Sequence, residues 1–478
     1  MTDQLPARQN VSTLDRLRRI ATSRAGLIVM AAIALALVIA LLPPPTGASP
    51  RAMMALGLTA FVVTLWATIA VPQPYAAAAF LALVLATGAA APDRALSGFT
   101  TSSLWLVFGG LLIGTAAERS GLGRLVARRF LGGFAASYAG LVAGILVGST
   151  LLSFLVPANM GRLAITVPVV MALCRDAGYG EGTPGWNGLM LTAVVGNFTV
   201  ALAILPANLL NVMIVGSGEA LYGVSFAYMT YLWLCGPVLG LVKGLVVWAV
   251  VVLMFKAAPP ERPAGEEATT LGVDAIKVGV ILAAAMALWA TDVWHGIKPG
   301  WVALAAGLAC LVPGFGTLDL KDGLDPKKLL IMLWVGTVLS LGPILGDSGA
   351  AGLLSQALAG ISGVSDQSPT YAYFAIALMT SVLAAIGTVG GAIPIVTAAI
   401  GEISSQTGLP VSTGILAVVA GASALFFPFV AAPVVVGLAM GRVAVRPATR
   451  FMVVLALVTI VVVLPLNALW WSVAGVMK

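Results

Sequence analysis

The stretch 153–168, SFLVPANMGRLAITVP, interrupts a strongly apolar region with two prolines, an Asn, a Gly and an Arg. Broken backbone survives at membrane depth only where it lines a cavity or is buried in protein, because each unpaired N–H or C=O group in lipid costs several kcal/mol. Such a break also exposes helix-terminal N–H groups, which are favourable sites for anions. The stretch therefore predicts one half of a binding site for a small anion inside a membrane protein.

The composition excludes an ordinary soluble domain. Of the 478 residues, 60% are hydrophobic and 9% are charged, whereas soluble domains carry about 25% charged residues. The net charge of +7 comes from basic residues in short loops, where they determine membrane topology rather than bind nucleic acid. The three cysteines are scattered and the single histidine, His295, lies beside a loop. Few residues are therefore available for a metal site or for histidine catalysis.

Long apolar runs predict membrane spans, since a spanning helix needs about 20 mainly apolar residues. Two pairs of shorter arms, at about 134–172 and 371–400, predict re-entrant hairpins with tips at 157–162 and 386–392. We therefore expect an all-α polytopic membrane protein with about eleven transmembrane helices and two re-entrant hairpins. The expected uninterrupted spans are 26–42, 53–71, 75–91, 104–117, 228–255, 271–290, 301–312, 329–345 and 451–473, and the broken spans are 188–215 and 414–438.

The same order of pieces occurs on both sides of the polar linker 256–270. Leu104-Trp105 leads through a Gly-rich span to Ser120-Gly121, and Leu333-Trp334 leads likewise to Ser348-Gly349. A hairpin and then a broken span follow in each half. Matching Gly/Pro breaks in two halves are the best sequence indication of a carrier site near the bilayer midplane.

The distribution of basic residues predicts the orientation. Arg16, Arg18, Arg19 and Arg24 precede an apolar run too long for a cleavable signal, so we expect a retained anchor and a cytoplasmic N-terminal segment, 1–24. We expect a loop at 346–370, holding Asp347 and Asp366 but no Lys or Arg, to lie outside. This placement requires hairpins that open from opposite faces, so we expect the two halves to be inverted repeats. We expect the protein in a bacterial-type inner (plasma) membrane. The basic patches then lie inside, at 119–129, 256–262, 321–328 and 442–450.

Arg162 lies just beyond the first tip. A charged residue at membrane depth costs at least about 2.5–3.5 kcal/mol, so its presence needs a reason. One hypothesis is that its guanidinium supplies positive charge that sodium supplies elsewhere and pairs with an anionic substrate. The alternative is that its side chain extends to the cytoplasmic face. Lys243, at the middle of a span, could contact a substrate or neutralise a helix C-terminus. The alternative is that it lies in a partly wet crevice.

Other polar residues at the breaks complete the candidate substrate site. Asn159 and Thr388 are the expected side-chain ligands, and tip glycines let backbone N–H groups approach a ligand closely. Packing between helices is the alternative role of these glycines. The tip glycines are Gly161, Gly387, Gly390 and Gly391, and the residues expected to face the tips from the broken spans are Asn197, Thr199, Asn208, Ser423 and Pro428.

Acidic residues fall near the ends of the expected spans, at Glu118, Glu181, Glu219, Asp292, Asp347 and Glu402. No carboxylate therefore stands clearly at mid-span to relay protons or bind a cation. This pattern favours an anionic substrate. It leaves open two kinds of coupling: cotransport of a proton bound to the substrate itself, and exchange for a counter-substrate.

The order of these pieces resembles the divalent anion/sodium symporter family from about residue 50 onward. LWLVFGGLLIGTAAERSGL (104–122) is similar to the family's span before the first hairpin, and PANLLNVMIVGSGE (206–219) to its Pro-x-Asn segment. The resemblance implies a homodimer in which a transport domain moves as an elevator against a scaffold. The domains that it implies are scaffold at 25–130 and 271–369, and transport at 131–255 and 370–478.

The resemblance also implies a Ser-Asn-Thr triplet at each tip that binds substrate and helps to hold sodium. Here the tips read Ala158-Asn159-Met160 and Gly387-Thr388-Val389. Most of the hydroxyl groups are missing, so the ligand set for sodium is poor, and coupling by sodium, protons or exchange stays open. The implied sodium positions are near Asn159 and Gly196, and near Thr388 and Ala422.

The function that these features favour is secondary active transport of a small anion, such as a dicarboxylate or sulfate, by a symporter or exchanger. The protein is not expected to be an enzyme, and no cofactor other than possible sodium ions is expected. The alternatives are a membrane-embedded enzyme, a passive channel, and a scaffold of the same fold that has lost transport.

Overall fold

A computed structural model describes residues 23–45, 47–123, 125, 134, 136–260, 272–363 and 367–478. The described chain is helical, and nine of its helices are long and apolar enough to cross a membrane. The protein is thus an all-α polytopic membrane protein, as predicted. Segment 1–24 and linker 256–270 lie largely outside the described residues, as do Arg124, Arg128, Arg129 and Asp366.

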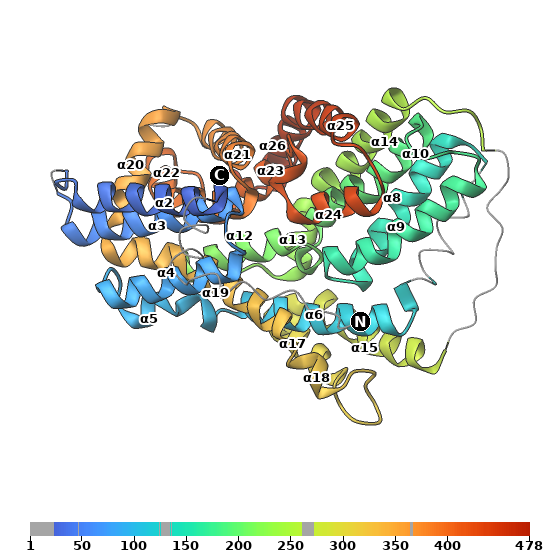
Figure 1. Cartoon of the computed structure of the whole chain (residues 1–478), viewed down its shortest axis with the longest axis horizontal. Helices are drawn as coiled ribbons and strands as arrows, with labels where there is room; N and C mark the ends of the chain where they lie inside the picture. The colour runs from blue at the N-terminus through green and yellow to red at the C-terminus, as the bar shows by residue number, and fades with distance from the viewer. Residues whose placement is uncertain are drawn as a thin grey trace, which may run out of the picture.

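The principal helices lie before residue 260 and after residue 272, and Figure 1 colours them in chain order from blue to red. They are α2 (Arg24–Leu41), α3 (Pro50–Thr68), α4 (Gln73–Thr87), α5 (Pro92–Ala95), α6 (Ser102–Arg119), α8 (Tyr138–Leu155), α9 (Asn159–Asp176), α10 (Pro184–Leu191), α11 (Asn197–Val200), α12 (Leu209–Tyr222), α13 (Tyr228–Cys235) and α14 (Lys243–Met254) in the first half; and α15 (Val273–Ala290), α16 (Asp292–His295), α17 (Pro299–Ala309), α18 (Leu320–Gly323), α19 (Pro326–Ser348), α20 (Ala350–Ser362), α21 (Pro369–Ile386), α22 (Val389–Thr407), α23 (Val411–Ala422), α24 (Ala432–Met440), α25 (Val445–Val458) and α26 (Leu464–Val473) in the second.

Both predicted hairpins are helix–break–helix pairs, but their tips are shorter than expected. The first break comprises residues 156–158, so Asn159 and Arg162 belong to the first turn of α9. The second break comprises Gly387 and Thr388 alone. Helical hydrogen bonding thus begins closer to each tip than the glycine content indicated. Whether the pairs re-enter the membrane stays a prediction.

Both predicted broken spans are interrupted. In the first, the helix continues through Gly196-Asn197 as a π-helical segment (η3, Thr192–Gly196) followed by α11. The break comes later, around the short 3-10 segment η5 (Leu205–Ala207). In the second, α23 ends at Ala422, and the 3-10 segment η7 (Pro428–Val430) precedes α24.

The predicted loop at 346–370 is wrong, because most of it forms helix α20. Its sequence AAGLLSQALAGIS places apolar residues at helical spacing, and the helix packs against α22. Its Ala and Leu residues also favour a helix, so the loop prediction overlooked a local signal.

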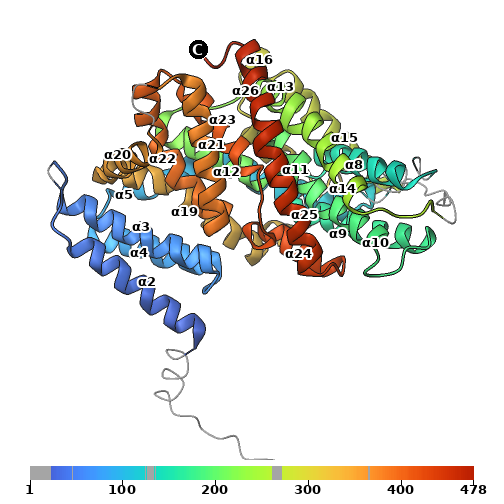
Figure 2. The same cartoon turned by 90° about the horizontal axis from the view of Figure 1, so that it is seen from above.

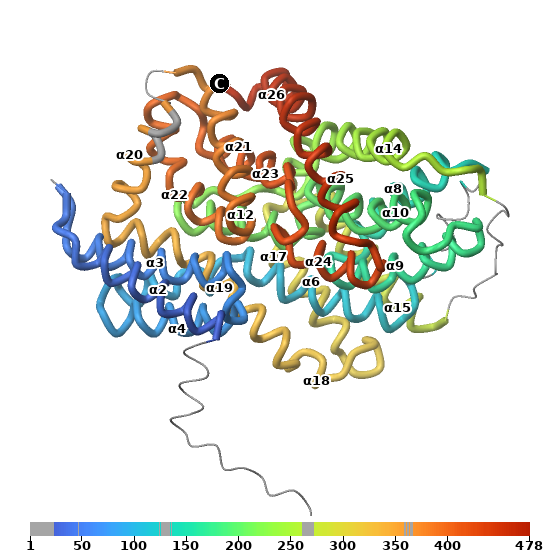
Figure 3. Tube along the Cα trace, turned by 45° about the horizontal axis from the view of Figure 1, so that its top comes forward, coloured from blue at the N-terminus to red at the C-terminus, as the bar shows by residue number. Residues whose placement is uncertain are grey.

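The two hairpins lie toward different ends of the molecule. Figure 1 shows α8, α9, α10 and α14 together at one end, whereas α20 and α22 lie near α2, α3 and α4 at the other, and the tube in Figure 3 shows the same division. Figure 2 shows α2 at the outer edge, where Ala32 alone of its 18 residues is buried. Such an apolar, outward-facing helix is suited to contact with lipid or with a second copy.

Helices α6 and α17 pack with their backbones in close approach. A Cβ atom on Gly109 would lie 2.2 Å from the carbonyl of Ala303, and one on Gly300 would lie 1.9 Å from the Ser102 carbonyl oxygen. Both glycines are therefore required by packing rather than by turn geometry. The backbones of α6 and α17 are therefore in direct contact.

Candidate functional site

The first tip is an extended link between two helices. α8 ends at Leu155, Val156 has φ −122° and ψ 95°, and Ala158 is the N-cap of α9 without a side-chain hydrogen bond. Two glycines of α6, Gly110 and Gly114, face Pro157 and Ala158. The small residues let the tip lie directly on α6, so a helix outside the hairpin fixes its position.

Arg162 joins this tip to the first broken span. Its Nε atom donates to Asn197 Oδ1 at 2.9 Å, and its Nη1 atom donates to the carbonyl oxygens of Val156 at 2.8 Å and Ala207 at 2.7 Å. Its Nη2 atom donates to Asn159 Oδ1. Arg162 is fully buried, so the alternative in which it extends to the cytoplasmic face is wrong.

The acceptors around Arg162 are all uncharged amide or carbonyl oxygens. Across the part of the chain that the structure describes, no carboxylate forms an ion pair with this guanidinium or with the Lys243 ammonium. Buried charges are normally paired, because an unpaired charge loses its hydration without gaining a counter-charge. The tip therefore holds a positive charge that its own side chains satisfy by hydrogen bonds but do not neutralise.

The first broken span has its freed carbonyl groups capped by side chains. Asn208 Nδ2 donates to the Phe198 carbonyl at 3.2 Å, and Asn211 Nδ2 donates to those of Ala201 at 3.2 Å and Ile204 at 2.9 Å. The hydroxyl group of Tyr231 donates to the Leu202 carbonyl at 2.9 Å. Asn208 Oδ1 also accepts from the Leu210 N–H at 3.1 Å and so caps α12. These bonds let a broken helix persist in an apolar interior.

The second broken span repeats this backbone geometry with other side chains. Ala431, the N-cap of α24, has φ −134° and ψ 119°, close to the φ −132° and ψ 126° of Asn208. Ser381 Oγ donates to the Gly421 carbonyl at 2.9 Å, and Ser423 Oγ donates to that of Ala420 at 2.6 Å. The second break thus uses hydroxyl groups where the first uses amides.

Lys243 supplies the charge at the second break. It is fully buried, and its Nζ atom donates to the Ser423 carbonyl at 3.2 Å and to Thr459 Oγ1. It directly follows a π-helical segment (η6, Gly236–Val242), and Thr459 begins another (η8, Thr459–Val463). The partly wet crevice considered for Lys243 is therefore wrong, because its side chain is enclosed by protein.

The second tip packs on α3 and α19. Thr388 is the N-cap of α22 and accepts from the Gly391 N–H at 3.3 Å. Gly387 faces Ala67 of α3, and Gly390 faces Trp334 of α19. The tip therefore rests on helices outside its own hairpin, as the first tip rests on α6.

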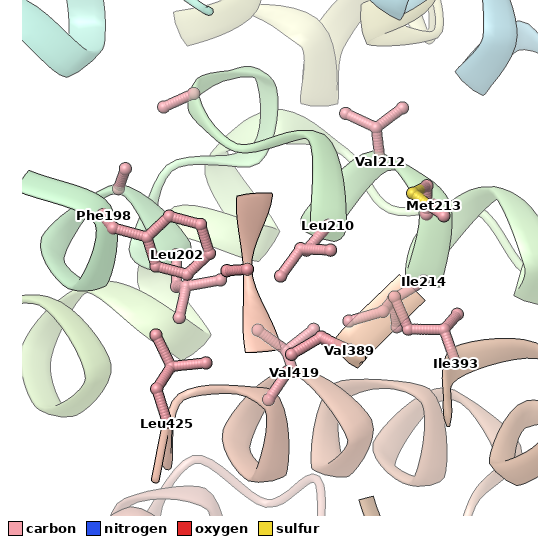
Figure 4. Packing of buried hydrophobic residues seen from close by; sticks show 14 of the residues in the cluster. Phe198, Leu202, Leu210, Val212, Met213, Ile214, Val389, Ile393, Val419 and Leu425 are labelled. Atoms are coloured by element: carbon pink, nitrogen blue, oxygen red, sulfur yellow. The ribbon is translucent and has the colours of Figure 1, made fainter. Parts of the chain in front are cut away.

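Apolar side chains pack between the first broken span and the second half. Figure 4 shows Phe198, Leu202 and Leu210 facing Val419 and Leu425 across the two breaks. Val389, at the start of α22, is buried in this cluster, so it contributes packing. Met160 and Ile386 are instead exposed, at 47% and 79%, so each tip also reaches the surface.

Two cavities lie near these elements. An apolar groove of about 510 Å³ lies between α8 and α14, and a smaller cavity surrounds Glu219 and Lys298, which form an ion pair at 2.6 Å. Neither cavity is lined by Asn159 or Thr388.

The structure brings together part of the predicted site. Arg162 donates hydrogen bonds to both Asn159 and Asn197, and the Ala207 carbonyl next to Asn208 belongs to the same network. Thr199 instead donates to the Val195 and Gly196 carbonyls of its own helix. Gly161 packs against Val156, and Pro428 begins η7.

Several partners in these networks were missed from the sequence. They are Asn211, Tyr231, Ser381 and Thr459, each a polar residue in an apolar segment. The signal that could have found Asn211 is its position one helical turn after Asn208. Thr459 offers no local signal, because its partner Lys243 lies 216 residues away.

Comparison with known families gives a match over nearly the whole chain. Residues 24–477 match a family described as the sodium:sulfate symporter transmembrane region. A membrane protein of Cupriavidus necator is 25% identical over 360 residues, which cover 70% of each chain. A putative malate transporter of Bacillus subtilis is 27% identical over 253 residues, which span about half of either protein (51% of this chain and 52% of that one).

Among solved structures, the YdaH transporter of Alcanivorax borkumensis, reported to have an unusual topology, has a similar fold. The TM-score is 0.56 at 14% identity, over 81% of this chain and 89% of that one. At this identity the similarity concerns the fold alone.

Proposed function

This chain belongs to the sodium:sulfate symporter family, and from that premise we propose that it carries a small divalent anion, such as sulfate or a dicarboxylate, by alternating access. Membership makes it a multi-pass membrane transporter rather than an enzyme. The putative malate transporter of Bacillus subtilis supports a dicarboxylate among the candidate substrates.

The observation that carries the proposal is the pair of buried cations at the breaks. Arg162 and Lys243 are both fully buried, and the side chains that contact them are uncharged. A charge at this depth costs at least about 2.5–3.5 kcal/mol, and its field in a low-dielectric interior attracts an opposite charge strongly. A bound dianion would supply the counter-charge that the protein lacks there.

We propose that the α8–α9 and α21–α22 pairs are re-entrant hairpins in inverted repeats, and that their tips help to bind the substrate. In this proposal Asn159, Met160 and Gly161 contribute at the first tip, and Gly387, Thr388 and Gly390 at the second. Both tips rest on helices assigned to the scaffold, α6 for the first and α3 with α19 for the second. This placement supports a transport domain, 131–255 with 370–478, that moves as an elevator against a scaffold, 25–130 with 271–369.

A homodimer in the inner (plasma) membrane, with its N-terminus in the cytoplasm, completes the proposal. Helix α2 supports it, because its apolar surface is exposed. The oligomeric state can be measured directly by light scattering of the purified protein in detergent.

The test is uptake of labelled sulfate and labelled malate into liposomes that contain the purified protein. We expect saturable uptake that is inhibited by an unlabelled excess and accelerated by the same anion inside. Linear, non-saturable flux would indicate a passive channel. Saturable uptake of neither anion, together with no thermal stabilisation by sulfate, dicarboxylates or citrate, would contradict the proposal and favour a scaffold that has lost transport.

A further inference from the structure

Sodium is the ion named in the family's description, and its expected positions near Asn159 and near Ala422 can be compared with the oxygen atoms present. Hard cations prefer oxygen ligands. At the first position, these oxygens belong to Val156, Asn159, Asn197 and Ala207. All four already accept hydrogen bonds from the Arg162 guanidinium.

A sodium ion does not fit this oxygen cage. The guanidinium nitrogens lie 2.7–2.9 Å from three of the four oxygens, so an ion placed among them would have to displace the side chain. It would also meet a fixed positive charge at short range in a low-dielectric interior, where like charges repel strongly. The first cage is therefore filled by the chain's own cation.

The second position, beside Ala422, has the same arrangement with a different cation. The carbonyl of Ser423, the next residue, accepts from the Lys243 ammonium, which also binds Thr459 Oγ1. The neighbouring carbonyls of Ala420 and Gly421 accept from Ser423 and Ser381. Thr388 Oγ1 is used to cap α22. These four oxygens are thus committed to donors within the protein.

We propose that Arg162 and Lys243 are resident cations that take the place of coupling sodium ions at the two breaks, so that this transporter works without sodium. The inference rests on the proposed function and deepens it, because two basic side chains, when both are protonated, match the charge of one dianion. No mobile cation is then needed to neutralise the substrate.

The first experiment measures sodium binding without transport. The melting temperature of the purified protein is compared in sodium, potassium and choline chloride at equal ionic strength. We expect the three values to agree, because a ligand stabilises only a state that binds it. A sodium-specific rise that saturates with concentration would overturn the inference.

The second experiment opens the first cage. Arg162→Gly removes the guanidinium and leaves its four acceptors, so we expect methylguanidinium at millimolar concentration to raise the melting temperature of this variant. Arg175→Gly, at an exposed position of the same helix, is the matched control and should show no rise. Absence of rescue in a folded Arg162→Gly protein would contradict the cage. If this variant does not fold, the melting temperatures of the unaltered protein in sodium, potassium and choline chloride decide whether the inference holds.

The third experiment separates this inference from the proposed function. Replacing sodium by choline on both sides of the liposome should change the initial rate of anion uptake by less than about twofold, equivalent to about 0.4 kcal/mol. Uptake that requires sodium would overturn the inference while the proposed function stands. Absence of anion uptake in every buffer would count against the proposed function, and the melting temperatures would still decide the inference.

Discussion

The two broken spans have nearly the same backbone geometry and very different chemistry. Asn208 and Ala431 differ by only a few degrees in φ and ψ. Around the first break lie an arginine and a cluster of amide side chains. Around the second lie a lysine, two serines and the stacked rings of Phe427 and Phe429, whose centroids are 5.4 Å apart.

This comparison teaches that a broken membrane helix needs its carbonyl groups satisfied, but not by any particular side chain. The requirement comes from the cost of unpaired backbone groups in an apolar interior. What both breaks share is one buried cation each. The positive charge is therefore the common chemical feature, and the surrounding acceptors and donors differ. Four sets of variants test this comparison.

Arg162→Met should have the largest effect. It leaves four acceptors without their donor, and the free energy of unfolding should fall by about 3 kcal/mol or more, since each unsatisfied buried acceptor costs about 1–3 kcal/mol. The melting temperature, followed by tryptophan fluorescence in detergent, measures the change. The control Arg175→Met alters an exposed residue of the same helix and should have little effect. A variant as stable as the parent would show that the first break does not depend on its cation.

Lys243→Met should have a smaller effect, because its ammonium group has two oxygen acceptors rather than four. We expect a loss of about 2 kcal/mol in the free energy of unfolding and a marked loss of anion uptake. Lys256→Met, beyond the end of α14 and exposed, is the control for the loss of a positive charge. An undiminished affinity for sulfate in Lys243→Met would separate the second cation from substrate binding.

Asn208→Ala gives the first break the residue type that the second has at Ala431. It removes the cap on Leu210 and the donor to Phe198, so we expect a loss of about 1–2 kcal/mol in the free energy of unfolding. Asn208→Asp keeps the acceptor that caps α12 and removes the donor. If the two variants melt at the same temperature, the donor matters and the cap does not.

Opposite substitutions at the two tips should have the smallest effects on stability. Thr388 caps α22 with its hydroxyl group, whereas Ala158 at the matching position caps α9 with none. Thr388→Ala should lower, and Ala158→Ser should raise, the free energy of unfolding by about 1 kcal/mol. Thr388→Ser preserves the hydroxyl and should melt close to the parent. A destabilised Ala158→Ser protein would show that close packing of the first tip on α6 outweighs the gain from a cap.

The sequence predicted the breaks themselves because Pro, Gly and Asn act locally. Pro157 and Pro206 cannot donate backbone hydrogen bonds, and their positions mark both breaks in the first half. The burial of Arg162 was not predictable in the same way. Its acceptors at Asn197 and Ala207 lie 35 and 45 residues away, so only the folded arrangement shows that its charge is held inside. Helix α20 was missed for a different reason, because the helical spacing of its own Ala and Leu residues was overlooked.

The two buried cations also have an electrical consequence. If both move with the transport domain, the complex with a dianion carries no net charge, and the membrane voltage neither drives nor opposes its movement. The empty protein would instead carry two charges, each worth about 2.3 kcal/mol per 100 mV across the full field. Return of the unloaded form would then be the voltage-sensitive step, and a second dianion on the opposite side would relieve it.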